Sequence, residues 1–313
     1  MRKPRPTIET RGLSPSFVGD DAKPATRSVA GTQHRWPARA ALLFVVCLNA
    51  LSAAGSVETF LQSLPDGQRS LLLGRREGPP QPLLFIFMGS IDTAMAEPLY
   101  TEVGKILAAE GVLSVVLDAP AHGGDAVPAE PSELSGWAHR VAEGKPFLAP
   151  FLERASAALD HFVATGMADP TRVAACGTSR GGFLAFQFAA HDPRIRCVGG
   201  IAPVTDLAAL REFSGWNPPP PTAELALATL APRLAGRPVW ICIGNDDARV
   251  STPRAIAFAE AVVAANRALP TPPDPIPVDL LVQSTPGHRS SAADHRRLSV
   301  WLRPHLGLPT SAE

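Results

Sequence analysis

The sequence predicts one α/β domain built around a mostly parallel β-sheet. Six short apolar segments are almost continuously hydrophobic, as expected for parallel strands that are covered on both faces. Segments with helical periodicity separate them, and this alternation of strand and helix is typical of βαβ units with right-handed crossovers. The predicted strands are 83–88, 113–118, 172–177, 196–202, 239–244 and 278–283.

The helices between these strands are predicted from their apolar faces and from residues at their ends. Segments 98–111 and 150–166 each place apolar side chains at helical spacing. Segment 251–269 opens with Thr252 as the expected N-cap and Pro253 in the first turn. Such helices are expected to cover both faces of the sheet.

Composition and charge exclude some classes of function. The chain has 29 basic and 29 acidic residues, so charge gives no reason to expect a nucleic-acid partner. The four cysteines show neither zinc-type nor paired spacing, and no metal site is predicted. Three of them lie in predicted strands and are expected to be buried thiols: Cys176, Cys197 and Cys242.

The N-terminal part differs from the rest of the chain. Residues 1–39 are polar and basic and are expected to be disordered, and 40–55 contains an apolar run that ends in small residues near Ala54. This layout predicts a signal peptide and export to the periplasm or medium. The run is shorter than the about 20 residues of a membrane span, so no stable span is expected after processing. An uncleaved membrane anchor and a cytoplasmic location are the alternatives. The α/β domain is predicted over 56–308, with a tail at 309–313.

A glycine-rich turn follows the third predicted strand. It reads Gly177-Thr178-Ser179-Arg180-Gly181, with a strand before it and a helical pattern after it. In that context G-x-S-x-G is a nucleophile elbow, which holds the serine in a strained conformation above the sheet. The helix that begins there directs free N–H groups at the same point, where they can stabilise an oxyanion. Ser179 is therefore the predicted nucleophile.

A nucleophilic serine needs a base and an acid to orient it. Asp247 follows the strand 239–244, and His288 follows the last strand, so the acid and the base come in the order expected for this elbow. Asp246 and Asp206 are alternative acids.

The other histidines are weaker candidates for the base. His295 and His305 fall in the C-terminal helix, where solvated positions are expected, and His191 ends a helix. His122 lies at another strand end, either as part of a turn or as a substrate contact. Arg180 is expected to form a structural ion pair rather than to bind a substrate carboxylate.

These motifs resemble those of the α/β-hydrolases. The resemblance covers about residues 70–305 and is closest to the branch of dienelactone hydrolases, acetyl-xylan-type esterases and prolyl-oligopeptidase catalytic domains. It is carried by the motifs "GTSRGG", "GNDDARV", "PGH" and "DAPAHG". It implies a sheet of about eight strands, Ser179 as nucleophile, Asp247 as acid and His288 as base. It also implies an oxyanion hole formed by the backbone N–H groups of Arg180 and Ser90.

The chain departs from its relatives beside Ser90, because Met88 and Gly89 stand where many relatives carry His-Gly. A backbone donor survives that change. A small cap is expected over about 204–236, where four consecutive prolines would stiffen the chain. In this cap, Phe213 and Trp216 are expected either to form walls of the substrate pocket or to pack the cap onto the sheet.

The combined expectation is a serine hydrolase that cleaves a small carboxylic ester through an acyl-enzyme, with no cofactor. The resemblance also allows a prolyl-oligopeptidase-type peptidase, and no propeller-like segment precedes the hydrolase region in this sequence. The ester hydrolase is therefore preferred to a gated peptidase. A hydrolase-fold protein that only binds its ligand is the other alternative, and the complete Ser-Asp-His set argues against it. The sequence leaves the oligomeric state open.

Overall fold

The computed structural model describes residues 57–214 and 225–309. Several expected features lie outside these residues: the disordered segment 1–39, the signal or anchor segment 40–55 with Cys47, the proline-rich part of the cap with Trp216, and most of the tail.

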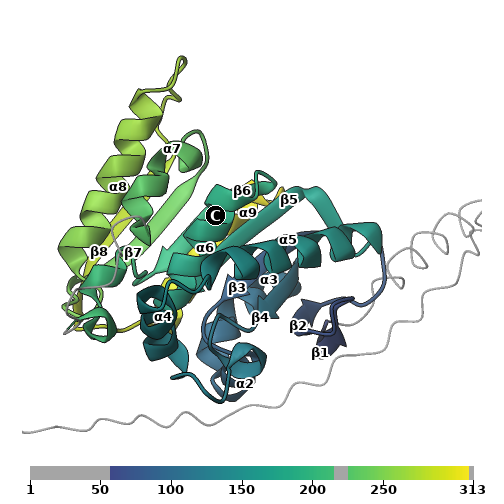
Figure 1. Cartoon of the computed structure of the whole chain (residues 1–313). Helices are drawn as coiled ribbons and strands as arrows, with labels where there is room; N and C mark the ends of the chain where they lie inside the picture. Colours follow the sequence, from purple (N-terminus) through teal and green to yellow (C-terminus); the bar gives the residue numbers. More distant parts are fainter. Residues whose placement is uncertain (1–56, 215–224, 310–313) are drawn as a thin grey trace, which may run out of the picture. The chain divides into compact units, whose positions relative to one another are not determined.

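The core of the fold is an eight-stranded sheet of order β1-β2-β4-β3-β5-β6-β7-β8 (Figure 1). β1, β2 and β4 pair in antiparallel fashion, and every pair from β4 to β8 is parallel. All six predicted strands are present. The strands are β1 (Glu58–Ser63), β2 (Arg69–Gly74), β3 (Gln81–Phe87), β4 (Leu113–Leu117), β5 (Ala168–Thr178), β6 (Ile195–Ile201), β7 (Val239–Asp246) and β8 (Val278–Pro286).

The hairpin β1–β2 was not among the predicted strands. β1 has only two apolar residues, and only Phe60 in it is buried, so it lacks the continuous hydrophobic run that marks the parallel strands. A tight turn connects the two strands, with Gly67 at a φ of 84°.

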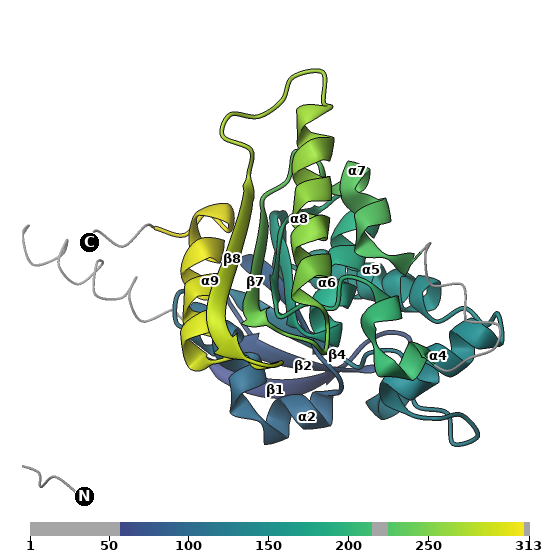
Figure 2. The same cartoon turned by 90° about the vertical axis from the view of Figure 1, so that its left-hand side faces the viewer.

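Helices cover both faces of the sheet (Figures 1 and 2). Phe85 and Phe87 point into one hydrophobic core with α4, α5, α6 and α8, whereas Leu84 and Ile86 point into a second core with α3 and α9. The helices are α2 (Ile91–Ala96), α3 (Glu102–Ala108), α4 (Glu133–Ala142), α5 (Leu148–Ala164), α6 (Arg180–His191), α7 (Ala231–Leu234), α8 (Thr252–Arg267) and α9 (Ala292–His305). Within the two described ranges, no helix has the length and apolar character needed to cross a membrane.

Two local predictions have clear outcomes. Cys176, Cys197 and Cys242 are free and buried, as expected, and burial raises the pKa of each thiol. The prediction of Thr252 as N-cap is wrong. Ser251 takes that position, and the hydroxyl of Thr252 bonds to the preceding loop instead.

Candidate active site

The chain turns sharply from β5 into α6 at Ser179. This serine has φ 56° and ψ −118°, a conformation that residues with a side chain rarely adopt. A Cβ atom on Gly177 would lie 2.2 Å from the carbonyl carbon of Gly181, and one on Gly181 would lie 1.8 Å from the carbonyl oxygen of Phe87. Neither glycine can therefore be replaced without moving backbone, and the strain at the elbow is built into the fold.

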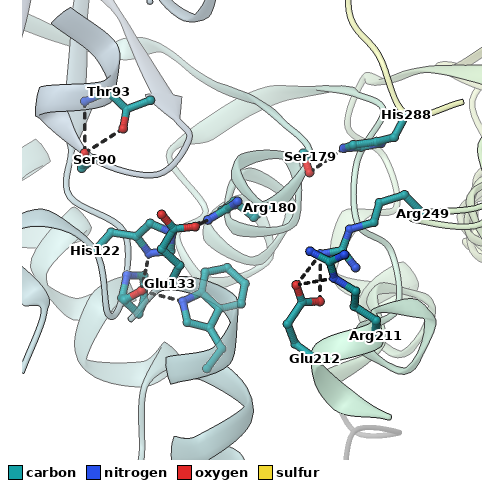
Figure 3. A network of polar contacts seen from close by, with 12 residues as sticks. Ser90, Thr93, His122, Glu133, Ser179, Arg180, Arg211, Glu212, Arg249 and His288 are labelled. Carbon is teal, nitrogen blue, oxygen red and sulfur yellow. Dashed lines mark hydrogen bonds and ion pairs between the residues drawn. The ribbon is translucent and has the colours of Figure 1, made fainter. Parts of the chain in front are cut away.

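Three residues from distant parts of the chain meet at this turn. His288 Nε2 lies 2.9 Å from Ser179 Oγ (Figure 3), and His288 Nδ1 lies 2.8 Å from Asp247 Oδ2. An ionised carboxylate can only accept a hydrogen bond, so the Nδ1 atom carries the proton and donates it to Asp247. The Nε2 atom is then left as an acceptor for the serine hydroxyl.

Asp247 is held in its ionised form by its surroundings. The residue is 2% exposed, and its Oδ1 accepts the backbone N–H groups of Arg249 at 3.0 Å and Val250 at 3.2 Å. Burial by itself would raise the pKa of this carboxyl. The hydrogen bond to His288 and those two backbone donors outweigh burial, and the pKa lies below its usual range.

Thr252 fastens the loop that carries Asp247. Its hydroxyl donates to the carbonyl oxygen of Gly244 at 2.6 Å and accepts the N–H of Asp247 at 3.1 Å. Both contacts are buried, so this side chain links the end of β7 to the start of α8 across the loop. The orientation of the Asp247 carboxylate is thus fixed from the backbone side as well.

The two alternative acids lie elsewhere. Asp246 ends β7 with its side chain exposed, and Asp206 begins the short 3₁₀ helix Leu207–Ala209, where it also pairs with Arg254. Among the three acids considered, the structure brings only Asp247 to His288.

The expectation that His295 is solvated is wrong. It is 2% exposed, because α9 packs this part of its surface against the sheet. His305, the last residue of α9, is half-buried, whereas His191 is exposed.

A cavity of about 410 Å³ opens over Ser179. Its walls are mixed in character, with two arginines and two glutamates among them. The lining residues are Met88, Gly89, Thr93, Glu97, Tyr100, His122, Glu133, Thr178, Ser179, Arg180, Ala202, His288, Arg289 and Ser290. Phe213 is not among them, since its ring is buried in the hydrophobic core. Of the two roles expected for Phe213, its position agrees with packing and not with a wall of this cavity.

The two backbone N–H groups expected to form an oxyanion hole, those of Arg180 and Ser90, lie in different surroundings. Arg180 is the first residue of α6, where a backbone N–H has no acceptor within the helix. Ser90 is the N-cap of α2, and its hydroxyl accepts the N–H of Thr93 at 3.1 Å. Ser90 does not line the cavity, whereas Met88 and Gly89 of the same loop do.

His122 and Arg180 both line the cavity, and their side chains contact each other (Figure 3). Arg180 Nη1 lies 2.6 Å from His122 Nε2 and 2.7 Å from Glu133 Oε2. The ion pair expected for Arg180 is therefore present, with Glu133 as its partner. Glu133 was not predicted as a site residue, because no local motif marks an acid that lies 47 positions from its partner. Arg289 was also missed, although its place beside His288 pointed to the site.

Comparisons with known proteins agree with this fold. The model of the prolyl oligopeptidase family matches residues 153–307, and among curated protein sequences none matches the chain. A structure described as a dienelactone hydrolase of Klebsiella pneumoniae has a TM-score of 0.57 at 18% identity, over 79% of this chain and 99% of that one. The esterase Pf2001 of Pyrococcus furiosus has a TM-score of 0.57 at 15% identity, over 81% of this chain and 94% of that one.

A puromycin-hydrolysing peptidase of Mycobacterium tuberculosis is also similar, with a TM-score of 0.60 at 19% identity. That match covers 83% of this chain and 41% of the peptidase. The sheet and these matches define the class of fold: the chain has the α/β-hydrolase fold. The match of residues 153–307 to the prolyl oligopeptidase family supports a serine hydrolase.

Proposed function

We propose that the protein is a serine hydrolase that cleaves a carboxylic ester, with Ser179 as nucleophile, His288 as base and Asp247 as the orienting acid. The observation that carries this proposal is the continuous hydrogen-bond chain from Ser179 through His288 to Asp247. It lies at the wall of a cavity and at the start of a helix. A buried carboxylate, an imidazole and a strained serine in this order are the parts that acyl transfer requires.

The proposed reaction has two stages. His288 Nε2 takes the Ser179 proton as the hydroxyl attacks the ester carbonyl, and Asp247 stabilises the imidazolium that forms. The oxyanion is bound by the N–H of Arg180 and by a backbone N–H of the loop 88–90, where the resemblance points to Ser90. The imidazolium protonates the leaving alcohol, and water then hydrolyses the acyl-enzyme by the same route.

The size and the charged lining of the cavity support the proposal of a small, polar substrate. Arg180, Glu133, Arg289 and Glu97 line a space of about 410 Å³, so a long apolar chain would desolvate charged groups there without compensation. A serine peptidase is the second candidate, and the match of residues 153–307 to the prolyl oligopeptidase family favours it. Export through the segment 40–55 stays a prediction.

Labelling with a fluorophosphonate probe tests the proposal, because only an activated serine reacts. We expect the wild-type protein to label and to hydrolyse p-nitrophenyl acetate, and Ser179→Ala to do neither while its melting temperature stays within a few degrees. Ser284→Ala, an exposed serine on β8, is the matched control and should label normally. Hydrolysis of proline-containing peptide amides in preference to the ester would favour the peptidase. Turnover by folded Ser179→Ala would exclude this nucleophile.

A further inference from the structure

His122, in the loop after β4, has no role in the proposed proton transfers, yet the residue is 5% exposed and both of its ring nitrogens have polar partners. His122 Nδ1 lies 2.7 Å from the carbonyl oxygen of Pro120, an atom that can only accept, so Nδ1 carries the proton. Nε2 is then an acceptor, and it faces Arg180 Nη1 at 2.6 Å. Burial, ahead of the nearby positive charge of Arg180, lowers the pKa of His122, which agrees with a neutral ring.

The same ring touches the loop that follows β3. A Cβ atom added to Gly89 would lie 3.1 Å from His122 Cδ2, so the imidazole edge packs against the backbone of that glycine. Two further hydrogen bonds hold the two loops together, one between backbone groups and one to the side chain of Asp118. Ala119 N donates to the carbonyl oxygen of Gly89 at 2.9 Å, and Ile91 N donates to Asp118 Oδ1 at 2.8 Å.

Helix α4 supports the ring from the other side. Trp137 Nε1 donates to the same Pro120 carbonyl oxygen at 2.6 Å, and its indole lies edge-on to the imidazole with centroids 6.2 Å apart. Trp137 is itself fully buried. The position of His122 is therefore set by buried groups, whereas Glu133, the second partner of Arg180, has a side chain that is 60% exposed.

We infer that His122 is a positioning residue of the oxyanion hole, which fixes Arg180 through Nε2 and the Gly89 loop through its ring. This inference rests on the proposed function, in which these two segments supply the N–H donors. An oxyanion gains from donors only when they are held in place before the reaction, and loss of one donor has cost about 10²–10³ in kcat in a comparable enzyme. We expect a donor that is only displaced to cause a smaller loss of kcat than a donor that is removed.

The test compares two replacements of His122 in p-nitrophenyl acetate hydrolysis. His122→Phe keeps a ring but removes the acceptor, and we expect kcat to fall by about 10- to 100-fold with KM nearly unchanged. His122→Gln offers a side-chain oxygen to Arg180, and it should recover a clear part of the loss. His191→Gln, an exposed histidine outside the cavity, is the control and should match the wild type.

A double-mutant cycle separates positioning from general stability. The backbone N–H of Arg180 survives in Arg180→Met, but the side chain that His122 holds is gone. Adding His122→Phe to that variant should then cost much less than it does in the wild type. An equal loss in both backgrounds, or a loss confined to KM, would overturn the inference.

The proposed function and the positioning role fail in different ways. A wild-type protein that neither labels with fluorophosphonate nor hydrolyses the ester contradicts the proposed function itself. An active wild type with full kcat in folded His122→Phe contradicts only the role of His122. Circular dichroism and thermal melting show whether His122→Phe folds. If it does not, His122→Gln is made in both the wild-type and the Arg180→Met backgrounds. An equal loss of kcat in the two backgrounds then counts against the inference.

Discussion

A single guanidinium nitrogen of Arg249 contacts both carboxylate oxygens of Glu212, at 2.7 Å and 2.8 Å. The backbone N–H of Arg249 also donates to Asp247. The ion pair therefore ties the loop of the proposed catalytic acid to the short 3₁₀ helix Arg211–Phe213. Burial would raise the pKa of Glu212, but the hydrogen bond from Arg249 outweighs it and keeps this pKa below its usual range.

Replacement of Glu212 should loosen the acid loop. The two side chains are 27% and 13% exposed, so the pair lies between a surface pair and a buried one, and Glu212→Gln should cost about 1–2 kcal/mol of stability. We also expect a several-fold loss of kcat, because Asp247 is oriented in part by the Arg249 backbone. Thermal melting and ester kinetics measure both effects. Arg211→Gln is the control, since that arginine is 84% exposed, and equal effects of the two variants would contradict this role of the pair.

Asp247 and Asp246 should differ sharply in their contribution to activity. Asp247→Asn keeps the size of the side chain but loses the charge and the preferred imidazole tautomer, and a fall in kcat of about 10⁴ is expected from the analogous replacement in a serine protease. Asp246→Asn should change kcat little, because its side chain is exposed at the end of β7. The measurement is kcat for p-nitrophenyl acetate at neutral pH. Greater sensitivity at Asp246 would mean that the wrong acid is assigned.

Buried His295 should make the protein less stable in mild acid. In the part of the chain that the structure describes, neither ring nitrogen has a hydrogen-bond partner, and burial lowers the pKa of this histidine. The unfolded chain therefore takes up the proton first. Stability is intact above the ordinary value of about 6.5 and is lost as the pH falls towards the lower folded-state pKa, by at most about 1.4 kcal/mol per pH unit.

Denaturant unfolding between pH 7 and pH 5 tests this prediction. His295→Leu should flatten the pH dependence of the unfolding free energy and should be no less stable than the wild type at pH 5. His191→Gln should keep the wild-type slope, because that side chain is exposed. A wild-type slope in His295→Leu would show that another group causes the acid sensitivity.

The cavity should select short acyl groups. Its volume of about 410 Å³ and its charged lining suit acetyl to butyryl esters better than long chains. Each methylene that fits is worth only about 1–3 kcal/mol, so the decline for longer chains must come from exclusion. The measurement is kcat/KM for p-nitrophenyl esters of increasing chain length. Equal values for acetate and palmitate would contradict it.

The local sequence was enough to predict the proposed nucleophile and the turn that holds it. The strand, the glycine turn and the helix around Ser179 are adjacent in the chain, so their conformation follows from short-range sterics that a motif records. The strands β3 to β7 were predictable for a similar reason, because the apolar run in each is buried. β8 was predicted from its apolar run as well, although its side chains are exposed or half-buried. β1 and β2 were not predicted, because β1 is an edge strand in which only Phe60 is buried and the apolar run of β2 is only three leucines long.

The tertiary structure decided which of the candidate site residues lie close together and which are buried. Asp246 and Asp247 are indistinguishable as letters, but one points to solvent and the other lies buried against His288. The burial of His295 and the contact of Arg180 with His122 likewise depend on how helices and loops pack on the sheet. A sequence pattern carries the period of a helix or strand. Side-chain contacts between residues about 50 or 100 positions apart form only when the helices and loops pack on the sheet and exclude water.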